Sequence, residues 1–151
     1  MSKEAVIYVA KIAYSTSVDG VGLRNSLYVS GCPIHCKGCH NPKLWDINAG
    51  KPQTVSQVFA SLNEDDFNIS ILGGEPLFQY DAILELCKRI KAETAKTIWM
   101  WSGYTYEHIQ EQYPEILEYI DVLVDGPFIE EQKDLTLDWR GSKNQRVIKL
   151  K

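Results

Sequence analysis

The segment Asn68-Ile69-Ser70-Ile71-Leu72-Gly73-Gly74-Glu75-Pro76 sets the architecture that we expect for this chain of 151 residues. Its first five residues are mostly apolar and predict a short buried strand, which the two glycines end. A helical pattern follows over residues 81–91, where Ile83, Cys87 and Ile90 share one face. The same order of strand, small-residue turn and helix recurs along the chain. It predicts an α/β fold with a mainly parallel sheet.

Five further strands and three further helices fit this pattern. The apolar residues after Thr54 are spaced i, i+3, i+4 and i+7, and Thr54 is a suitable N-cap for the helix that they predict. Thr105 can cap a second helix, and Pro114 can begin a third. Because a closed eight-stranded barrel takes about 250 residues, we expect an incomplete βα barrel or a curved open sheet, in a single domain of residues 1–151. The further strands are predicted at residues 6–14, 26–30, 97–101, 121–124 and 147–150.

Four loops that contain chemically useful residues each follow one of these strands. The carboxyl ends of parallel strands meet at one edge of a sheet, and ligands of α/β folds bind there. The sequence therefore predicts that the four loops face one common edge. They are residues 31–40, 73–76, 102–104 and 125–127.

The composition favours a soluble globular enzyme or binding domain. The chain has 16 basic and 20 acidic residues, a net charge of −4, so no strong basic field attracts nucleic acid. The apolar run at residues 5–10 is far shorter than the roughly 20 residues of a membrane span, and its flanks do not fit a secretion signal. We therefore expect a cytoplasmic protein with no membrane contact.

Three of the four cysteines fall within eight residues, with the spacing Cys-x3-Cys-x2-Cys. In a reducing compartment, Cys32, Cys36 and Cys39 are better explained as metal ligands than as disulfide partners. The spacing alone leaves two sites open. One is a closed zinc site completed by His35 or His40, and the other is an iron–sulfur cluster. A four-iron cluster held by only three cysteines has one iron open to a ligand. The fourth cysteine, on the apolar face of the helix predicted at 81–91, is expected to be a small buried core residue.

The Gly73-Gly74-Glu75 turn suits a ligand that approaches the backbone closely. Glycine permits positive φ and has no side chain in the way. The carboxylate of Glu75 can accept hydrogen bonds from an ammonium group. A pair of glycines is most often only a turn, but beside an open iron on the same edge it indicates a cofactor site.

The cysteine spacing followed by Gly-Gly-Glu-Pro resembles the radical S-adenosylmethionine enzymes. That resemblance implies a four-iron, four-sulfur cluster whose open iron binds the methionyl amino and carboxylate groups of S-adenosylmethionine. One electron then cleaves the sulfonium to give methionine and a 5′-deoxyadenosyl radical. The cofactor carries the chemistry, while the protein orients it and excludes water.

Further segments make the resemblance more specific, to one group within the radical S-adenosylmethionine enzymes. Residues 19–24 and 40–45 are similar to the activating proteins of glycyl radical enzymes. Residues 99–104, 121–126 and 139–146 resemble the activators of anaerobic ribonucleoside-triphosphate reductase in particular. The resemblance covers residues 19–146. It implies that the radical takes a hydrogen from one glycine of that reductase and leaves a glycyl radical there.

The resemblance also implies a role for individual residues. Gly38 stands where most of the superfamily has an aromatic residue, and His40 follows the third cysteine, where the activators usually have an aromatic residue. The implied cluster ligands are Cys32, Cys36 and Cys39. The implied contacts to S-adenosylmethionine are Gly38, Cys39 and His40 beside the cluster, Gly73, Gly74 and Glu75 at the methionyl ammonium, and Ser102 and Asp125 at the methionyl or ribose groups.

The implied partners are the glycyl-radical subunit of the reductase and reduced flavodoxin or ferredoxin as electron donor, with a homodimer as a plausible assembly. We expect a loop of the reductase to enter over the cluster, held in part by Arg140 and Lys143. Other small radical S-adenosylmethionine enzymes share these motifs, namely the pyruvate formate-lyase activators and the deazaguanine synthases of queuosine biosynthesis. A zinc-stabilised binding module without catalysis is the alternative from another class.

Overall fold

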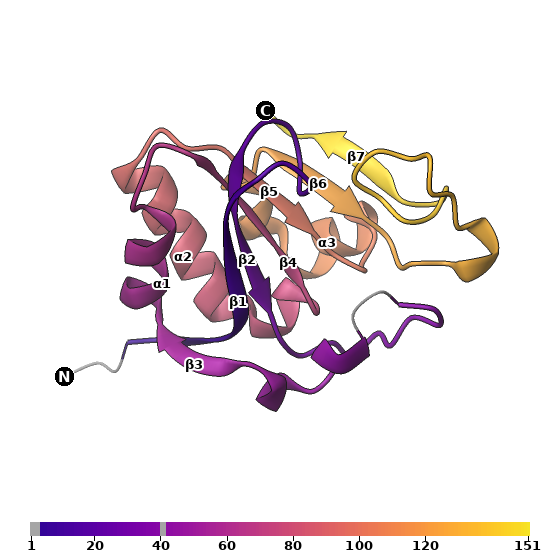
Figure 1. Ribbon diagram of the computed structural model, residues 1–151, viewed down its shortest axis with the longest axis horizontal. Helices are drawn as coiled ribbons and strands as arrows, with labels where there is room; N and C mark the ends of the chain where they lie inside the picture. The colour runs from indigo at the N-terminus through magenta and orange to yellow at the C-terminus, as the bar shows by residue number, and fades with distance from the viewer. Residues whose placement is uncertain (1–3, 40–41) are drawn as a thin grey trace.

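A single sheet of seven strands organises the structure, a computed structural model that describes residues 4–39 and 42–151 (Figure 1). The strands are β1 (Val6–Thr16), β2 (Arg24–Val29), β3 (Lys51–Thr54), β4 (Asn68–Gly73), β5 (Ile98–Trp101), β6 (Val122–Asp125) and β7 (Arg146–Lys149). The α-helices are α1 (Val55–Leu62), α2 (Tyr80–Glu93) and α3 (Tyr106–Gln112). Short 3-10 helices span Pro42–Leu44, Ile47–Ala49, Pro76–Gln79, Pro114–Glu118 and Glu130–Gln132.

The strands follow the order β3-β1-β2-β4-β5-β6-β7. The central strands β2, β4, β5 and β6 pair in parallel, whereas β1 and β3 at one side and β7 at the other pair antiparallel. The expectation of an α/β fold with an open, mainly parallel sheet is confirmed. Within the described residues the sheet does not close into a barrel.

The strand that sequence reasoning missed is β3. It reads Lys51-Pro52-Gln53-Thr54, which has no apolar alternation and contains a proline that cannot donate a hydrogen bond. It forms because it lies at the edge of the sheet, where it pairs with residues 6–9 of β1. Thr54 then ends the strand and caps α1 as expected, through a capping box with Gln57 (Thr54 Oγ1 accepts from Gln57 N at 3.1 Å).

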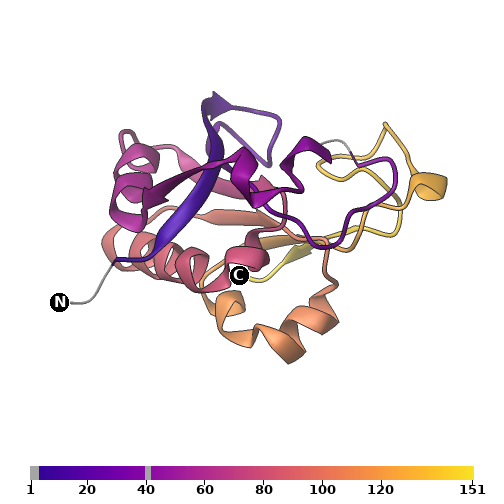
Figure 2. The same cartoon turned by 90° about the horizontal axis from the view of Figure 1, so that it is seen from below.

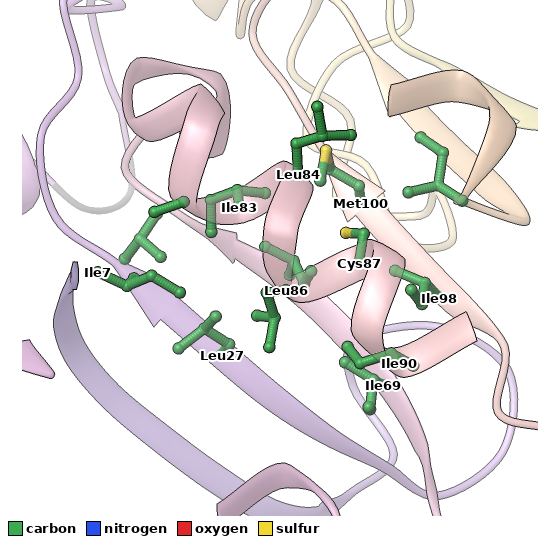
Figure 3. Close-up of a cluster of buried hydrophobic side chains, with 14 of the residues drawn as sticks. Ile7, Leu27, Ile69, Ile83, Leu84, Leu86, Cys87, Ile90, Ile98 and Met100 are labelled. Carbon is green, nitrogen blue, oxygen red and sulfur yellow. The ribbon is translucent and has the colours of Figure 1, made fainter. Parts of the chain in front are cut away.

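One face of the sheet packs against α1 and α2 and forms the main hydrophobic core (Figure 3). The pattern follows strand geometry, because alternate side chains of a strand point to opposite faces. Cys87 on α2 is fully buried among these side chains, which confirms its interpretation as a core residue. The core residues that the strands contribute include Ile7, Leu27, Ile69, Ile71, Ile98, Met100 and Leu123.

The opposite face has no α-helix against it in the described part of the chain. Figure 2 shows α2 and α3 on one side of the sheet and the loop of residues 17–23 on the other. Trp99, Val122 and Val124 form a second, smaller apolar cluster on this face, with Trp101 and Trp139 packed against it. No helix among the described residues is long and apolar enough to cross a membrane.

A buried arginine on this face forms hydrogen bonds with the amino ends of the central strands. Arg24 donates to Ser70 Oγ (2.9 Å) and to the carbonyl oxygens of Ile69 (2.8 Å) and Thr97 (3.1 Å). Its guanidinium lies over the ring of Trp99, 5.5 Å from the centroid. Burial lowers the pKa of Arg24 to about 10, so the group stays charged at neutral pH and its hydrogen bonds are charge-assisted.

Candidate cofactor site

The four loops meet around one cavity of about 380 Å³ at the carboxyl ends of the parallel strands. The expectation of a common edge is therefore confirmed for the cysteine loop, for Gly73 to Glu75 and for Ser102 to Gly103, and the last loop contributes Gly126. Both ribbon views place the cysteine loop and residues 126–145 at the same end of the molecule. The cavity is lined by Val18, Asp19, Cys32, Ile34, Cys36, Cys39, Trp45, Leu72, Gly73, Gly74, Glu75, Trp101, Ser102, Gly103, Val124, Gly126, Phe128, Trp139, Arg140, Gly141 and Gln145.

The cysteine loop is anchored at both of its ends. Gly31 N donates to Leu44 O (2.7 Å), and Cys32 N donates to Trp45 O (3.0 Å), so the chain returns beside its own starting point. Within the loop, the ring of His35 stacks on Trp45, with centroids 4.4 Å apart. These contacts hold the described residues 31–39 of the loop at the end of β2.

The three cysteines of the loop are half-buried and all line the cavity. Burial raises the pKa of the Cys32 and Cys36 thiols, and repulsion between the sulfurs is a smaller cause. Among the described residues, no three His, Cys, Asp or Glu side chains are placed to hold a single metal ion. The donor set fits an iron–sulfur cluster, because thiolate is its usual ligand and each cysteine binds a different iron.

The two glycines bring the end of β4 against the cysteine loop. Gly73 has φ +118°, a conformation that favours glycine. Gly74 N donates to Val29 O and Glu75 N donates to Gly31 O, both at 2.8 Å. A Cβ on Gly74 would lie 2.6 Å from the carbonyl oxygen of Gly31, so only glycine fits. The turn thus joins the start of the cysteine loop to the cavity wall.

Glu75 joins the ends of β4 and β5. Its carboxylate is fully buried and accepts from Leu77 N (3.0 Å), Ser102 Oγ (2.9 Å) and Gly103 N (2.6 Å). These three donors occupy most of the roughly four acceptor positions of a carboxylate. Burial is the main cause that raises the pKa of Glu75 to about 7, against a usual value of 4.5, while its hydrogen bonds act in the opposite direction. Glu75 therefore fixes the cavity wall, whatever else it binds.

This pKa predicts a pH-dependent stability. Because the folded protein holds the Glu75 proton more tightly than the unfolded chain, the stabilisation is complete below about pH 4.5 and is lost as the pH rises to about 7. The loss corresponds to about 3 kcal/mol in the free energy of unfolding. Urea unfolding of cluster-free wild type and Glu75→Gln between pH 5 and pH 7.5 measures it. The wild type should lose more stability across this range than the variant, and equal slopes would contradict the assignment.

The other residues that the sequence predicts to contact S-adenosylmethionine differ in how they lie relative to the cavity. Ser102 is buried, lines the cavity and is held by Glu75. Gly38 has φ +77°, and a Cβ there would lie 3.2 Å from Phe128. Asp125 is buried but does not line the cavity. Its carboxylate accepts from Tyr106 N (2.7 Å) and from the backbone and guanidinium of Arg146. His40 lies outside the described residues.

Some cavity residues were not singled out from the sequence as cofactor contacts. Trp139, Gly141 and Gln145 belong to the segment 126–145, which has no regular element apart from one 3-10 turn. No periodic pattern predicts where such a segment folds. Its sequence signal is the resemblance of residues 139–146 to the reductase activators, which does not identify cavity contacts.

Comparison with known proteins agrees with this geometry. Residues 18–148 match the family model of the 4Fe-4S single cluster domain. The match decides between the two metal sites that the cysteine spacing left open, in favour of the iron–sulfur cluster.

Three relatives carry the name anaerobic ribonucleoside-triphosphate reductase-activating protein. The protein of Vibrio cholerae is 42% identical over 139 residues, which cover 86% of this chain and 90% of the relative. That of Escherichia coli K12 is 41% identical over 143 residues, 89% of this chain and 93% of the relative. That of enterobacteria phage T4 is 35% identical over 139 residues, 86% of each chain. With this identity over most of its length, and with the cysteine loop at the cavity, the chain belongs to the family of anaerobic ribonucleoside-triphosphate reductase-activating proteins.

Proposed function

We propose that this chain activates an anaerobic ribonucleoside-triphosphate reductase by generating a glycyl radical on it. Its cofactors are a [4Fe-4S] cluster and S-adenosylmethionine. When bound, they supply the reductive cleavage of S-adenosylmethionine to methionine and a 5′-deoxyadenosyl radical, which takes one hydrogen atom from the Cα of the target glycine. The observation that carries the proposal is that the three cysteines and the Gly73-Gly74-Glu75 turn line one and the same cavity.

The residues of the cavity have separate roles in this proposal. Cys32, Cys36 and Cys39 hold the cluster. The turn at Gly73 and Gly74 receives the methionyl ammonium, because a backbone without side chains lets the ligand reach its carbonyl oxygens. Glu75 offers its remaining acceptor position to the ammonium and, with Ser102, keeps the turn in place. Beside the cluster, Cys39 lines the cavity and Gly38 does not. The contacts of Gly38, Cys39 and His40 with S-adenosylmethionine are proposed from the resemblance, and His40 lies outside the described residues.

Asp125 does not line the cavity and is bound within the protein. Its hydrogen bonds to Arg146 and Tyr106 join β6 to β7 and to α3. Asp125 therefore acts on the bound ligand indirectly, by fixing the position of the carboxyl end of β6.

The target is a protein segment, and the fold offers it an approach. The face of the sheet that carries Trp99 and Trp101 is covered by loops and not by an α-helix in the described residues, and we propose that a loop of the reductase reaches the cavity over the cysteine loop. Glycine suits hydrogen abstraction, because no side chain obstructs its Cα. We further propose reduced flavodoxin or ferredoxin as electron donor, a cytoplasmic location, a homodimer, and a partial barrel of the radical S-adenosylmethionine type.

An anaerobic assay tests the function. The protein is reconstituted with iron and sulfide, reduced with dithionite and given S-adenosylmethionine, and 5′-deoxyadenosine is quantified with and without the candidate reductase. Electron paramagnetic resonance then detects the glycyl radical. We expect both products. Deoxyadenosine without a radical on the reductase would point to another substrate, and no deoxyadenosine from a fully loaded protein would overturn the proposal.

A further inference from the structure

Arg140 is the one cationic side chain among the described residues that line the cavity. It lies in the segment 126–145, between Trp139 and Gly141, which line the same wall. Lys143, three residues further on, is exposed and does not line the cavity. The two cations that the sequence suggested as holding the partner's loop therefore occupy different environments.

The wall that carries Arg140 is held by hydrogen bonds. Trp101 Nε1 donates to Trp139 O at 2.6 Å, and the edge of the Trp139 ring packs on Trp99 with centroids 5.2 Å apart. Gly141 N donates to Gln145 Oε1 at 2.8 Å. Arg140 Nη1 itself donates to Gln145 O at 2.7 Å, which uses one of its five N–H donors. The backbone around Arg140 is thus fixed before any ligand binds.

Phe128 connects this wall to the cysteine loop. A Cβ on Gly38 would lie 3.2 Å from the Phe128 ring, and a Cβ on Gly141 would lie 2.9 Å from it. The residue next to Arg140 and the residue next to Cys39 therefore pack against the same ring. This places Arg140 on the part of the cavity wall beside the cysteine loop.

The guanidinium has no carboxylate partner in the described part of the chain, where no Asp or Glu oxygen lies within 4.0 Å of it. The two acids of the cavity are engaged elsewhere. Asp19 accepts from Tyr28 Oη at 2.5 Å, and Glu75 accepts from its three donors. A half-buried, positioned guanidinium with free donors is suited to bind an anionic group of a ligand.

We infer that Arg140 binds the methionyl carboxylate of S-adenosylmethionine. This inference rests on the proposed function, because it takes S-adenosylmethionine as the ligand of the cavity. The ligand carries one carboxylate, together with an ammonium and a sulfonium. The glycine turn suits its ammonium. Its carboxylate, which would also meet the open iron of the cluster, has a second oxygen that can accept from the guanidinium of Arg140. A carboxylate of the partner's segment is the other source of the same chemistry, but it would more readily meet the exposed Lys143.

The test measures binding rather than turnover. Equilibrium dialysis of radiolabelled S-adenosylmethionine with the cluster-loaded protein compares wild type, Arg140→Ala, Arg140→Lys and the control Lys143→Ala. Loss of a charge-assisted contact should weaken binding about tenfold to a hundredfold in Arg140→Ala. Arg140→Lys should recover part of the loss, because it keeps the charge without the planar donor pair. Lys143→Ala should bind as the wild type does.

A second ligand tests how much the methionyl carboxylate alone contributes to binding. Decarboxylated S-adenosylmethionine lacks the group that Arg140 is inferred to bind, so wild type and Arg140→Ala should bind it equally. If Arg140→Ala weakened both ligands by the same factor, the residue would act only through the shape of the wall. Circular dichroism and thermal unfolding test whether each variant is folded. If Arg140→Ala does not fold, Arg140→Lys is compared with the wild type in its place.

The outcomes separate this inference from the proposed function. Arg140→Ala that binds S-adenosylmethionine normally but fails to produce the glycyl radical would assign the residue to the partner's segment and overturn the inference. If wild type forms no radical on the reductase while Arg140→Ala still weakens binding selectively, the inference stands and the proposed partner is wrong.

Discussion

Cys36→Ala should lose the iron–sulfur absorption and produce 5′-deoxyadenosine only at the level of iron-free protein. Three cysteines hold the cluster in the proposed site, and two thiolates cannot retain it under reducing assay conditions. The cluster supplies the electron to S-adenosylmethionine, so its loss removes the reaction rather than slowing it. Iron content, visible absorption and deoxyadenosine yield are measured on the same anaerobic sample.

Cys87→Ala is the matched control for this substitution. Cys87 is fully buried on α2 among core side chains, and burial raises the pKa of its thiol to about 12, so it is not a thiolate at neutral pH. The control should keep its iron and its activity and lose only about 1 kcal/mol of stability through a small cavity. Normal deoxyadenosine production by Cys36→Ala would remove Cys36 from the cluster ligands.

Gly73→Ala should lower the free energy of unfolding by about 3–5 kcal/mol, a loss at the upper end of what single substitutions cause. A Cβ at this position would lie 2.5 Å from both the amide nitrogen and the carbonyl oxygen of Val29 on β2. These are backbone atoms in the middle of the sheet, so they cannot move aside as a side chain can. The φ of +118° adds strain for any L-residue. Urea unfolding monitored by circular dichroism gives the change.

Gly22→Ala measures the cost of a positive φ alone, without the steric clash that a Cβ at Gly73 makes with Val29. Gly22 also has a positive φ, +78°, but nothing lies within 4 Å of its Cβ position. It should cost only about 1–2 kcal/mol, the cost of placing an L-residue in the left-handed region. Equal losses in the two variants would show that the packing of Gly73 against β2 contributes nothing.

The central strands were predictable because local pattern and tertiary role agree there, whereas the assignment of the three cysteines as cluster ligands stays a prediction. Residues 68–72 are mostly apolar and form β4, and Thr54 meets the requirements of an N-cap and forms one. The common edge was predictable from topology alone, since parallel strands place their carboxyl ends together. The prediction that residues 1–151 form one domain stays a prediction.

Other parts depend on contacts that no local pattern encodes. β3 is a strand only because β1 lies beside it, and its proline and lysine give no β pattern. The role of Glu75 in joining β4 to β5 depends on Ser102 and Gly103, which lie 27 and 28 residues away. The wall formed by residues 139–141 is held by Trp101 and Gln145 rather than by regular structure. These three features can be recognised only when the folded structure is known.

The tryptophans that gather at the cavity give the protein a built-in optical reporter. Three of its four tryptophans, Trp45, Trp101 and Trp139, line the cavity, and the fourth, Trp99, packs against two of them. Indole emission is sensitive to nearby metal clusters and to the polarity of its surroundings, so nearly all the intrinsic fluorescence of this chain originates at the cofactor site. Loading with iron and sulfide should quench that fluorescence, and ligand binding can be followed without any added label.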